Sequence, residues 1–208
     1  MNGRPPGFPE RIAIASRNTH KLREIGRICA DWPVGWLTVS DHDAPWPDVE
    51  ETGSTYLENA LLKARAVTAA LGVPALADDS GIEVDALGGK PGPRSARYAG
   101  DDASDERNLQ ALMRAVAGVP AGGRTARYRC LAALAWPDGA EQHAEGVCEG
   151  ALVSKRRGTR GFGYDPIFVP EGDTRTTAQM PAAEKDAISH RGRAFRALAD
   201  VLPEVVGA

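Results

Sequence analysis

The sequence predicts an α/β protein in which helices flank a mixed β-sheet. Near the N-terminus, the apolar run 11–15 leads through a polar turn into an amphipathic segment, which is typical of a strand followed by a helix. Further along, the segments 125–135 and 141–153 are joined by Trp-Pro-Asp-Gly, which predicts an antiparallel hairpin. The sheet is therefore expected to be mixed. No G-x-G-x-x-G or G-x-x-x-x-G-K-[ST] occurs, which disfavours the Rossmann and P-loop classes.

The composition is that of a globular protein. Of the 208 residues, 42% are hydrophobic and 25% are charged, which suits one domain or two closely packed lobes. The net charge of −3 argues against a nucleic-acid partner. The 3 cysteines are widely spaced, which predicts reduced thiols and a cytoplasmic location. No apolar stretch of about 18 residues occurs, so no membrane partner is expected.

Residues 1–10, rich in proline and glycine, are predicted to be a flexible N-terminal extension without the apolar core of a secretory signal, and residues 11–208 a single domain. Thr55-x-x-Glu58 is a capping box and Gly72 is a C-terminal stop, so a helix is predicted between them. The other predicted elements are a helix at 103–117, a mostly helical segment at 182–202, and strands at 36–39, 74–77, 82–84 and 167–169.

Two adjacent carboxylates, Asp78 and Asp79, directly follow the apolar run 74–77 and precede Ser80 and Gly81. We expect a turn after Asp79, which would bring both carboxylates to one mouth. A solvated turn without function is the alternative interpretation of the same residues. The glycine- and proline-rich segment that follows, 85–100, is typical of a functional loop.

Three further features indicate where a ligand binds. The turn before Lys21 precedes a helix, and a helix N-terminus attracts anions; a lysine there opposes the helix dipole unless an anion lies between them. Asn59 and Lys63 are four residues apart on one helix face, which is predicted to look toward a cleft or toward solvent. Phe162, beside Gly163, is either part of the core or a flat surface for a nucleobase. Stacking on such a ring stabilises a bound base by roughly 1–3 kcal/mol.

The charged residues of these segments suit a nucleoside triphosphate bound with a divalent metal. Clustered carboxylates repel a triphosphate by about 4 kcal/mol per charge pair at roughly 4 Å, and Mg2+ relieves this because it binds carboxylates and phosphates together. A remaining carboxylate can orient or deprotonate a water molecule. The spacing leaves open which aspartate is the base. The residues concerned are Glu51, Asp78 and Asp79 with Lys21, Lys63, Lys185 and Arg191.

Six segments carry a resemblance to a known family: Ala15–Lys21, Glu51–Ala64, Ala77–Gly81, Ser95–Tyr98, Gly161–Pro166 and Glu184–Gly192. In this order, and over nearly the whole chain from Arg11, they resemble the inosine-triphosphate pyrophosphatases, which act on non-canonical purine nucleotides. Arg17 departs from the pattern, since many members have glycine there.

The resemblance implies an elongated mixed sheet with two lobes around a central substrate cleft, and a homodimer. It implies hydrolysis of ITP, dITP and XTP to the monophosphate and pyrophosphate with Mg2+, which cleanses the nucleotide pool. Asp79 matches the proton acceptor. Metal binding is implied for Glu51 and Asp79, with Asp78 as a further candidate beside them. Substrate binding is predicted for Ser16, Asn18, Lys21, Lys63, Ser80, Phe162, Gly163, Tyr164, Asp165, Lys185, His190 and Arg191.

Purine selectivity is expected from Arg191, because a guanidinium only donates hydrogen bonds: it can donate to a 6-keto oxygen but not to a 6-amino group. Two alternatives remain open: a Maf-like pyrophosphatase that acts on pyrimidine or modified nucleotides, and a nucleotide-binding regulator without catalysis. Glu51 and Asp79 argue against the regulator, because a protein that only binds gains little from anions beside a triphosphate.

Overall fold

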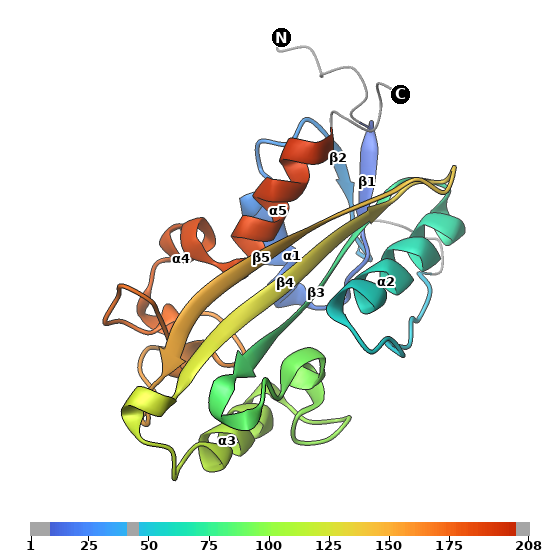
Figure 1. Ribbon diagram of the computed structural model, residues 1–208. Coiled ribbons are helices and arrows are strands. Elements are labelled where there is room, and N and C mark those ends of the chain that lie inside the picture. Colours follow the sequence, from blue (N-terminus) through green and yellow to red (C-terminus); the bar gives the residue numbers. More distant parts are fainter. Residues whose placement is uncertain (1–8, 41–45, 203–208) are drawn as a thin grey trace. The chain divides into compact units, whose positions relative to one another are not determined.

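The computed structural model describes residues 9–40 and 46–202, so residues 1–8 of the predicted extension lie outside the described part. The predicted mixed α/β class is confirmed: a six-stranded sheet has the order β2-β1-β3-β4-β5-β6 (Figure 1). β1 pairs in parallel with β2 and β3, and β5 pairs antiparallel with β6. The strands are β1 Arg11–Ile14, β2 Gly35–Leu37, β3 Ala75–Val84, β4 Thr125–Ala135, β5 Glu141–Leu152 and β6 Phe168–Pro170.

Five α-helices accompany these strands in the described residues: α1 Thr19–Ile28, α2 Tyr56–Leu71, α3 Asp105–Ala115, α4 Ala182–Ile188 and α5 His190–Val201. The prediction that 182–202 is mostly helical is confirmed, but the segment forms two helices. Ser189 ends α4 with an extended backbone, at ψ 155°, and α5 begins at the next residue. This break places His190 at the start of a new helix.

The predicted turn after Asp79 is also wrong, because β3 runs from Ala75 to Val84 without interruption. The apolar residues on both sides of the aspartates are buried: Leu76 precedes them and Ile82 follows them, each 0% exposed. Core packing at both ends thus keeps the intervening Asp-Asp-Ser-Gly segment extended. Local turn preference is outweighed by burial and by the sheet.

The chain divides into two compact units. The first unit comprises the described residues of 1–79, 130–146 and 191–208, and its core includes Ile12, Ile25, Leu76, Leu134 and Phe195. The second unit comprises 80–129 and 147–190, and its core includes Ile82, Leu109, Leu112, Tyr128 and Phe168. β3, β4 and β5 each contribute residues to both units.

The signals for helix ends and for the hairpin are confirmed. The Thr55 hydroxyl accepts from the Glu58 amide at 3.2 Å, and the Glu58 carboxylate accepts from the Thr55 amide at 3.1 Å. Gly72 ends α2 in the left-handed conformation, with φ 68°. At the hairpin, the Trp136 amide donates to the Ala140 carbonyl at 2.9 Å. None of the helices in the described residues is both long enough and apolar enough to span a bilayer.

Candidate functional site

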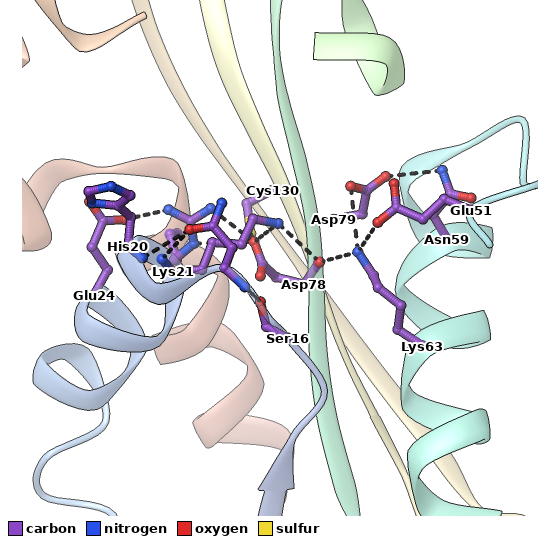
Figure 2. Close-up of polar contacts among 12 residues, drawn as sticks. Ser16, His20, Lys21, Glu24, Glu51, Asn59, Lys63, Asp78, Asp79 and Cys130 are labelled. Atoms are coloured by element: carbon purple, nitrogen blue, oxygen red, sulfur yellow. Dashed lines mark hydrogen bonds and ion pairs between the residues drawn. The ribbon is translucent and has the colours of Figure 1, made fainter. Parts of the chain in front are cut away.

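Asp78 and Asp79 point to opposite sides of β3 (Figure 2). Successive side chains alternate along a strand, so neighbours in sequence enter different surroundings. Asp78 lies with Lys21 and Cys130, whereas Asp79 lies on the side of α2 with Asn59 (Figure 2). Both aspartates are buried, at 2% and 4% exposure. The two carboxylates therefore do not share one mouth, contrary to the expectation from a turn.

Asp78 is held in a network of buried charges. Its Oδ2 atom lies 3.1 Å from the Lys21 Nζ, accepts from the Arg191 Nη2 at 3.0 Å and from the Cys130 thiol at 3.8 Å. Arg191 also donates to Glu24. Burial favours a higher pKa for Asp78, but the attraction of Lys21 and Arg191 outweighs it and holds the pKa well below its usual range. Asp78 thus stays ionised and fixes Lys21.

Arg191, which is predicted to contact the purine base, is already bound by two carboxylates of the protein. Its guanidinium is 1% exposed and is engaged by Asp78 and Glu24. Removing Arg191 would leave two buried carboxylates without this partner. Contact of Arg191 with a 6-keto oxygen stays a prediction, whereas its structural role is visible.

Asp79 contacts two side chains of α2. Its Oδ2 accepts from the Asn59 amide at 3.2 Å, and its Oδ1 lies 3.8 Å from the Lys63 Nζ. The same Nζ donates to Glu51 at 2.7 Å. Burial raises the pKa of Asp79 above its ordinary value, while Lys63 and Lys21 oppose this shift without cancelling it. Asp79 and Glu51 therefore meet around one ammonium group.

Gly53 allows the segment with Glu51 to lie against α2. Its amide donates to the Asn59 Oδ1 at 2.8 Å. A Cβ atom at Gly53 would lie 2.6 Å from that oxygen and 2.7 Å from the Glu58 Cβ, which is closer than atoms pack. Asn59 thus binds Gly53 with its oxygen and Asp79 with its nitrogen, and so sets the position of Asp79.

The two predicted lysines converge on one backbone atom. The Asp78 carbonyl accepts from the Lys63 Nζ at 2.8 Å and from the Lys21 Nζ at 3.3 Å. The side chains keep 13% and 15% of their surface exposed. Two ammonium groups this close repel each other, so an anion that reaches both is attracted. This arrangement supports the predicted anion site.

The turn before α1 is organised by its own side chains. Asn18 is the N-cap, and its oxygen accepts from the amides of His20 at 2.9 Å and Lys21 at 3.2 Å. The Ser16 hydroxyl accepts from the Asn18 amide at 3.2 Å. Arg17, the departure from the family pattern, donates to the Trp46 carbonyl at 2.9 Å. Ser16 and Asn18 therefore shape the turn that presents Lys21.

The donor set on the Asp79 side fits a magnesium ion better than the predicted set of three carboxylates. Magnesium takes one or two carboxylates and leaves its other positions to water and phosphate. Asp79 and Glu51 form such a pair around Lys63, whereas the Asp78 side chain has no exposed surface and points the other way (Figure 2). Among the described residues, no group of three or more His, Cys, Asp or Glu is arranged to hold a metal.

A second predicted group lies within the second unit, around Asp165. Its Oδ2 accepts from the Lys185 Nζ at 2.5 Å and from the Phe162 amide at 2.9 Å. Lys185 also lies over the Phe162 ring, 5.3 Å from its centre. A Cβ atom at Gly161 would lie 1.9 Å from the same oxygen, so only glycine allows this close approach. A charged donor is thereby fixed beside a flat ring.

The remaining predicted residues of the second unit have mostly internal contacts. The Tyr164 hydroxyl donates to the Ser95 carbonyl at 2.7 Å, and burial raises its pKa above the usual range. The Gly163 amide donates to Asp105 at 3.1 Å. Ser80 is half-buried on β3, and His190 stacks on Tyr128. Tyr164 and Gly163 therefore hold the loop that carries Phe162.

Sequence reasoning missed Glu24, Cys130 and Tyr128. Glu24 follows Lys21 by three residues, which is a same-face spacing on a helix and is the one available signal. Cys130 and Tyr128 lie on β4, on either side of Arg129, and nothing in the local pattern marks them. Their importance comes from contacts with Asp78 and His190, far away in the sequence.

Comparisons with known proteins identify the family of the chain. A model of the Ham1 family matches residues 12–201. A dITP/XTP pyrophosphatase of Streptomyces coelicolor is 50% identical over 198 residues, which is 95% of this chain and 99% of the relative. The solved Ham1 protein of Staphylococcus aureus is 39% identical, with a TM-score of 0.81, over 94% of this chain and 99% of that one. A HAM1 protein of Coxiella burnetii is 41% identical, with a TM-score of 0.82, over 93% and 98%. The chain belongs to the Ham1 family.

Proposed function

We propose that the protein hydrolyses the non-canonical purine nucleoside triphosphates ITP, dITP and XTP to the monophosphate and pyrophosphate. The observation that carries this proposal is the pair of lysines, Lys21 and Lys63, that converges beside the buried carboxylate of Asp79. Relatives of about half-identical sequence bear the name dITP/XTP pyrophosphatase. An anion site beside a carboxylate suits cleavage of a phosphoanhydride rather than binding alone.

Asp79 is the proton acceptor for the attacking water. Its raised pKa makes its carboxylate a better base than an exposed aspartate, and Asn59 fixes one of its oxygens. Lys21 and Lys63 bind the phosphate oxygens and stabilise the negative charge that develops on them. Asp78 holds Lys21 without taking part in proton transfer, because its low pKa makes it a weak base.

Magnesium would be held by Asp79 and Glu51 together with the phosphates. When bound, the ion supplies positive charge that offsets the repulsion between the carboxylates and the triphosphate. Lys63 lies between these two carboxylates in the described structure, 2.7 Å from Glu51 and 3.8 Å from Asp79. Asp78 is not part of this proposed ligand pair.

The base lies against Phe162, with Lys185 beside it. An ammonium group only donates hydrogen bonds, so Lys185 can donate to a 6-keto oxygen but finds no acceptor in a 6-amino group. Asp165 fixes this ammonium, and His190 completes the proposed pocket. We further propose that the protein is cytoplasmic and forms a homodimer. Light scattering coupled to gel filtration would test the dimer.

The test is pyrophosphate release from ITP, XTP, GTP, ATP and dTTP, with magnesium and with EDTA, by the wild type and by Asp79→Asn. We expect fast release from ITP and XTP that needs magnesium and is lost in the variant. Preference for dTTP would instead favour the Maf-like alternative. Binding of ITP without any release would favour the regulator.

A further inference from the structure

We propose that Tyr128 is a positioning residue for His190: its ring sets the plane of the imidazole and thereby the orientation of the purine base. The proposal rests on the proposed function, in which His190 contacts the substrate. Tyr128 lies on β4, outside all the segments that carry the family resemblance. It is expected to act only through His190.

The two rings are stacked. Their centres are 4.6 Å apart and their planes differ by 8°. Tyr128 is 9% exposed and His190 is 6% exposed, so both rings are largely shielded from water. A parallel stack of this kind restricts rotation of the imidazole out of the shared plane, because rotation would drive its edge into the phenol ring.

The ring of Tyr128 is held in place by a second aromatic ring, that of Phe168. Phe168, which is fully buried, meets the Tyr128 ring edge-on, with centres 4.7 Å apart and planes at 66°. Phe168 approaches β5 closely at Gly150, where a Cβ atom would lie 2.7 Å from the Phe168 ring and 2.2 Å from the Val169 carbonyl. Glycine on β5 therefore permits the position of Phe168, which in turn limits the position of Tyr128.

His190 needs such a support because it stands at a junction. α4 ends at Ser189 in an extended conformation, and α5 begins at His190. The hydrogen bonds of an imidazole lie in the plane of its ring, so the plane decides which atoms of a bound base it reaches. Lys185, on α4 just before this junction, is fixed by Asp165. The stack on Tyr128 gives His190 an equivalent constraint.

Replacing the ring should weaken substrate binding more than chemistry. In Tyr128→Leu we expect the KM for ITP to rise by roughly tenfold, the scale of one lost aromatic pair, with kcat within about twofold of the wild type. Tyr128→Phe keeps the ring and should keep the wild-type KM. A matched control is Leu109→Ala, which opens the same core on α3 away from His190 and should lower Tm without this change in KM.

A double-mutant cycle separates positioning from general destabilisation. Because Tyr128 is proposed to act through His190, Tyr128→Leu should have no further effect on kcat/KM in a His190→Ala background. Independent, additive effects of the two substitutions would overturn the proposal. So would a KM change in Leu109→Ala as large as that in Tyr128→Leu.

A measurement without turnover keeps this inference separate from the proposed function. In NMR spectra, the His190 ring protons should be shifted upfield by the Tyr128 ring in the wild type and in Tyr128→Phe, and the shift should disappear in Tyr128→Leu. The His190→Ala spectrum identifies the signals. Unchanged His190 signals in Tyr128→Leu would refute the stack as a constraint, even if the wild type releases pyrophosphate from ITP. Absence of release from any nucleotide would overturn the proposed function and with it the role in orienting the base, whereas the NMR shifts would still report whether Tyr128 constrains His190.

Discussion

Asp78 and Asp79 are consecutive residues of β3, yet their pKa values shift in opposite directions: burial favours a higher pKa for both, and only at Asp78 do the charged partners outweigh it. Asp78 is matched by Lys21 and Arg191, so its pKa lies below the usual range. Asp79 lies near Lys63 at 3.8 Å, and its pKa is raised. Because successive side chains of a strand point to opposite faces, Asp78 is placed where it stabilises the fold and Asp79 where it is suited to proton transfer.

Neutralising Asp78 should therefore cost much more stability than neutralising Asp79. Asp78→Asn leaves Lys21 and Arg191 without their buried counter-charge, and we expect a loss of about 3–5 kcal/mol in the free energy of unfolding. Asp79→Asn removes a charge that the folded state disfavours, so the change should lie within about 1 kcal/mol or be a gain. Urea denaturation at pH 7 measures both. A larger loss in Asp79→Asn would contradict this assignment.

The lowered pKa of Asp78 also predicts how the stability of the protein changes at acid pH. Its contribution is fully present above about pH 4, where an unfolded aspartate ionises, and is lost progressively as the pH falls toward the lower folded value. The wild type should thus lose stability steeply below about pH 4, and Asp78→Asn should show a flatter dependence over the same range. Thermal melts from pH 2 to pH 6 compare the two proteins.

Glu51→Gln should raise the magnesium concentration needed for half-maximal activity. Glu51 is one of the two proposed ligand carboxylates, and the amide keeps its size while removing its charge. We expect roughly a tenfold or greater increase in the magnesium requirement, with partial recovery at high magnesium, since losing a ligand weakens binding without removing Asp79. Glu50→Gln, on the exposed neighbouring residue, is the matched control and should leave the requirement unchanged.

The same substitution should have opposite effects at two glycines. Gly53→Ala forces a methyl group to within 2.6 Å of the Asn59 oxygen, so we expect a loss of about 1–3 kcal/mol and reduced activity through Asn59 and Asp79. Gly26→Ala, within α1 and with no atom nearby, should gain about 0.5–1 kcal/mol. Denaturation and steady-state rates check both. Equal effects at the two positions would show that the close approach at Gly53 does not matter.

Asn18 allows helix capping to be separated from anion binding. Asn18→Ala removes the cap of α1 and should cost about 1 kcal/mol of stability. Asn18→Asp keeps a good cap but adds a negative charge beside Lys21, so we expect near wild-type stability with an increased KM for ITP. An unchanged KM in Asn18→Asp would place the phosphates away from this turn.

Local features were predicted well because their causes are local. The capping box of Thr55 and Glu58, the left-handed Gly72 and the hairpin turn at 136–139 depend on residues within a few positions of one another. The segment with Asn59 and Lys63 was also placed correctly, since residues four apart share a helix face. These signals place the main helix and the sheet class, but not what surrounds each side chain.

The sequence by itself determined the α/β class, the family segments and the types of charged groups that a nucleotide requires. Only the tertiary structure decided that Asp78 and Asp79 alternate on one strand, because burial of Leu76 and Ile82 outweighs the turn preference between them. It also decided that Arg191 binds Asp78, 113 residues away, and that Tyr128 stacks on His190. Such contacts depend on the packing of distant elements, so no local pattern in the chain predicts them.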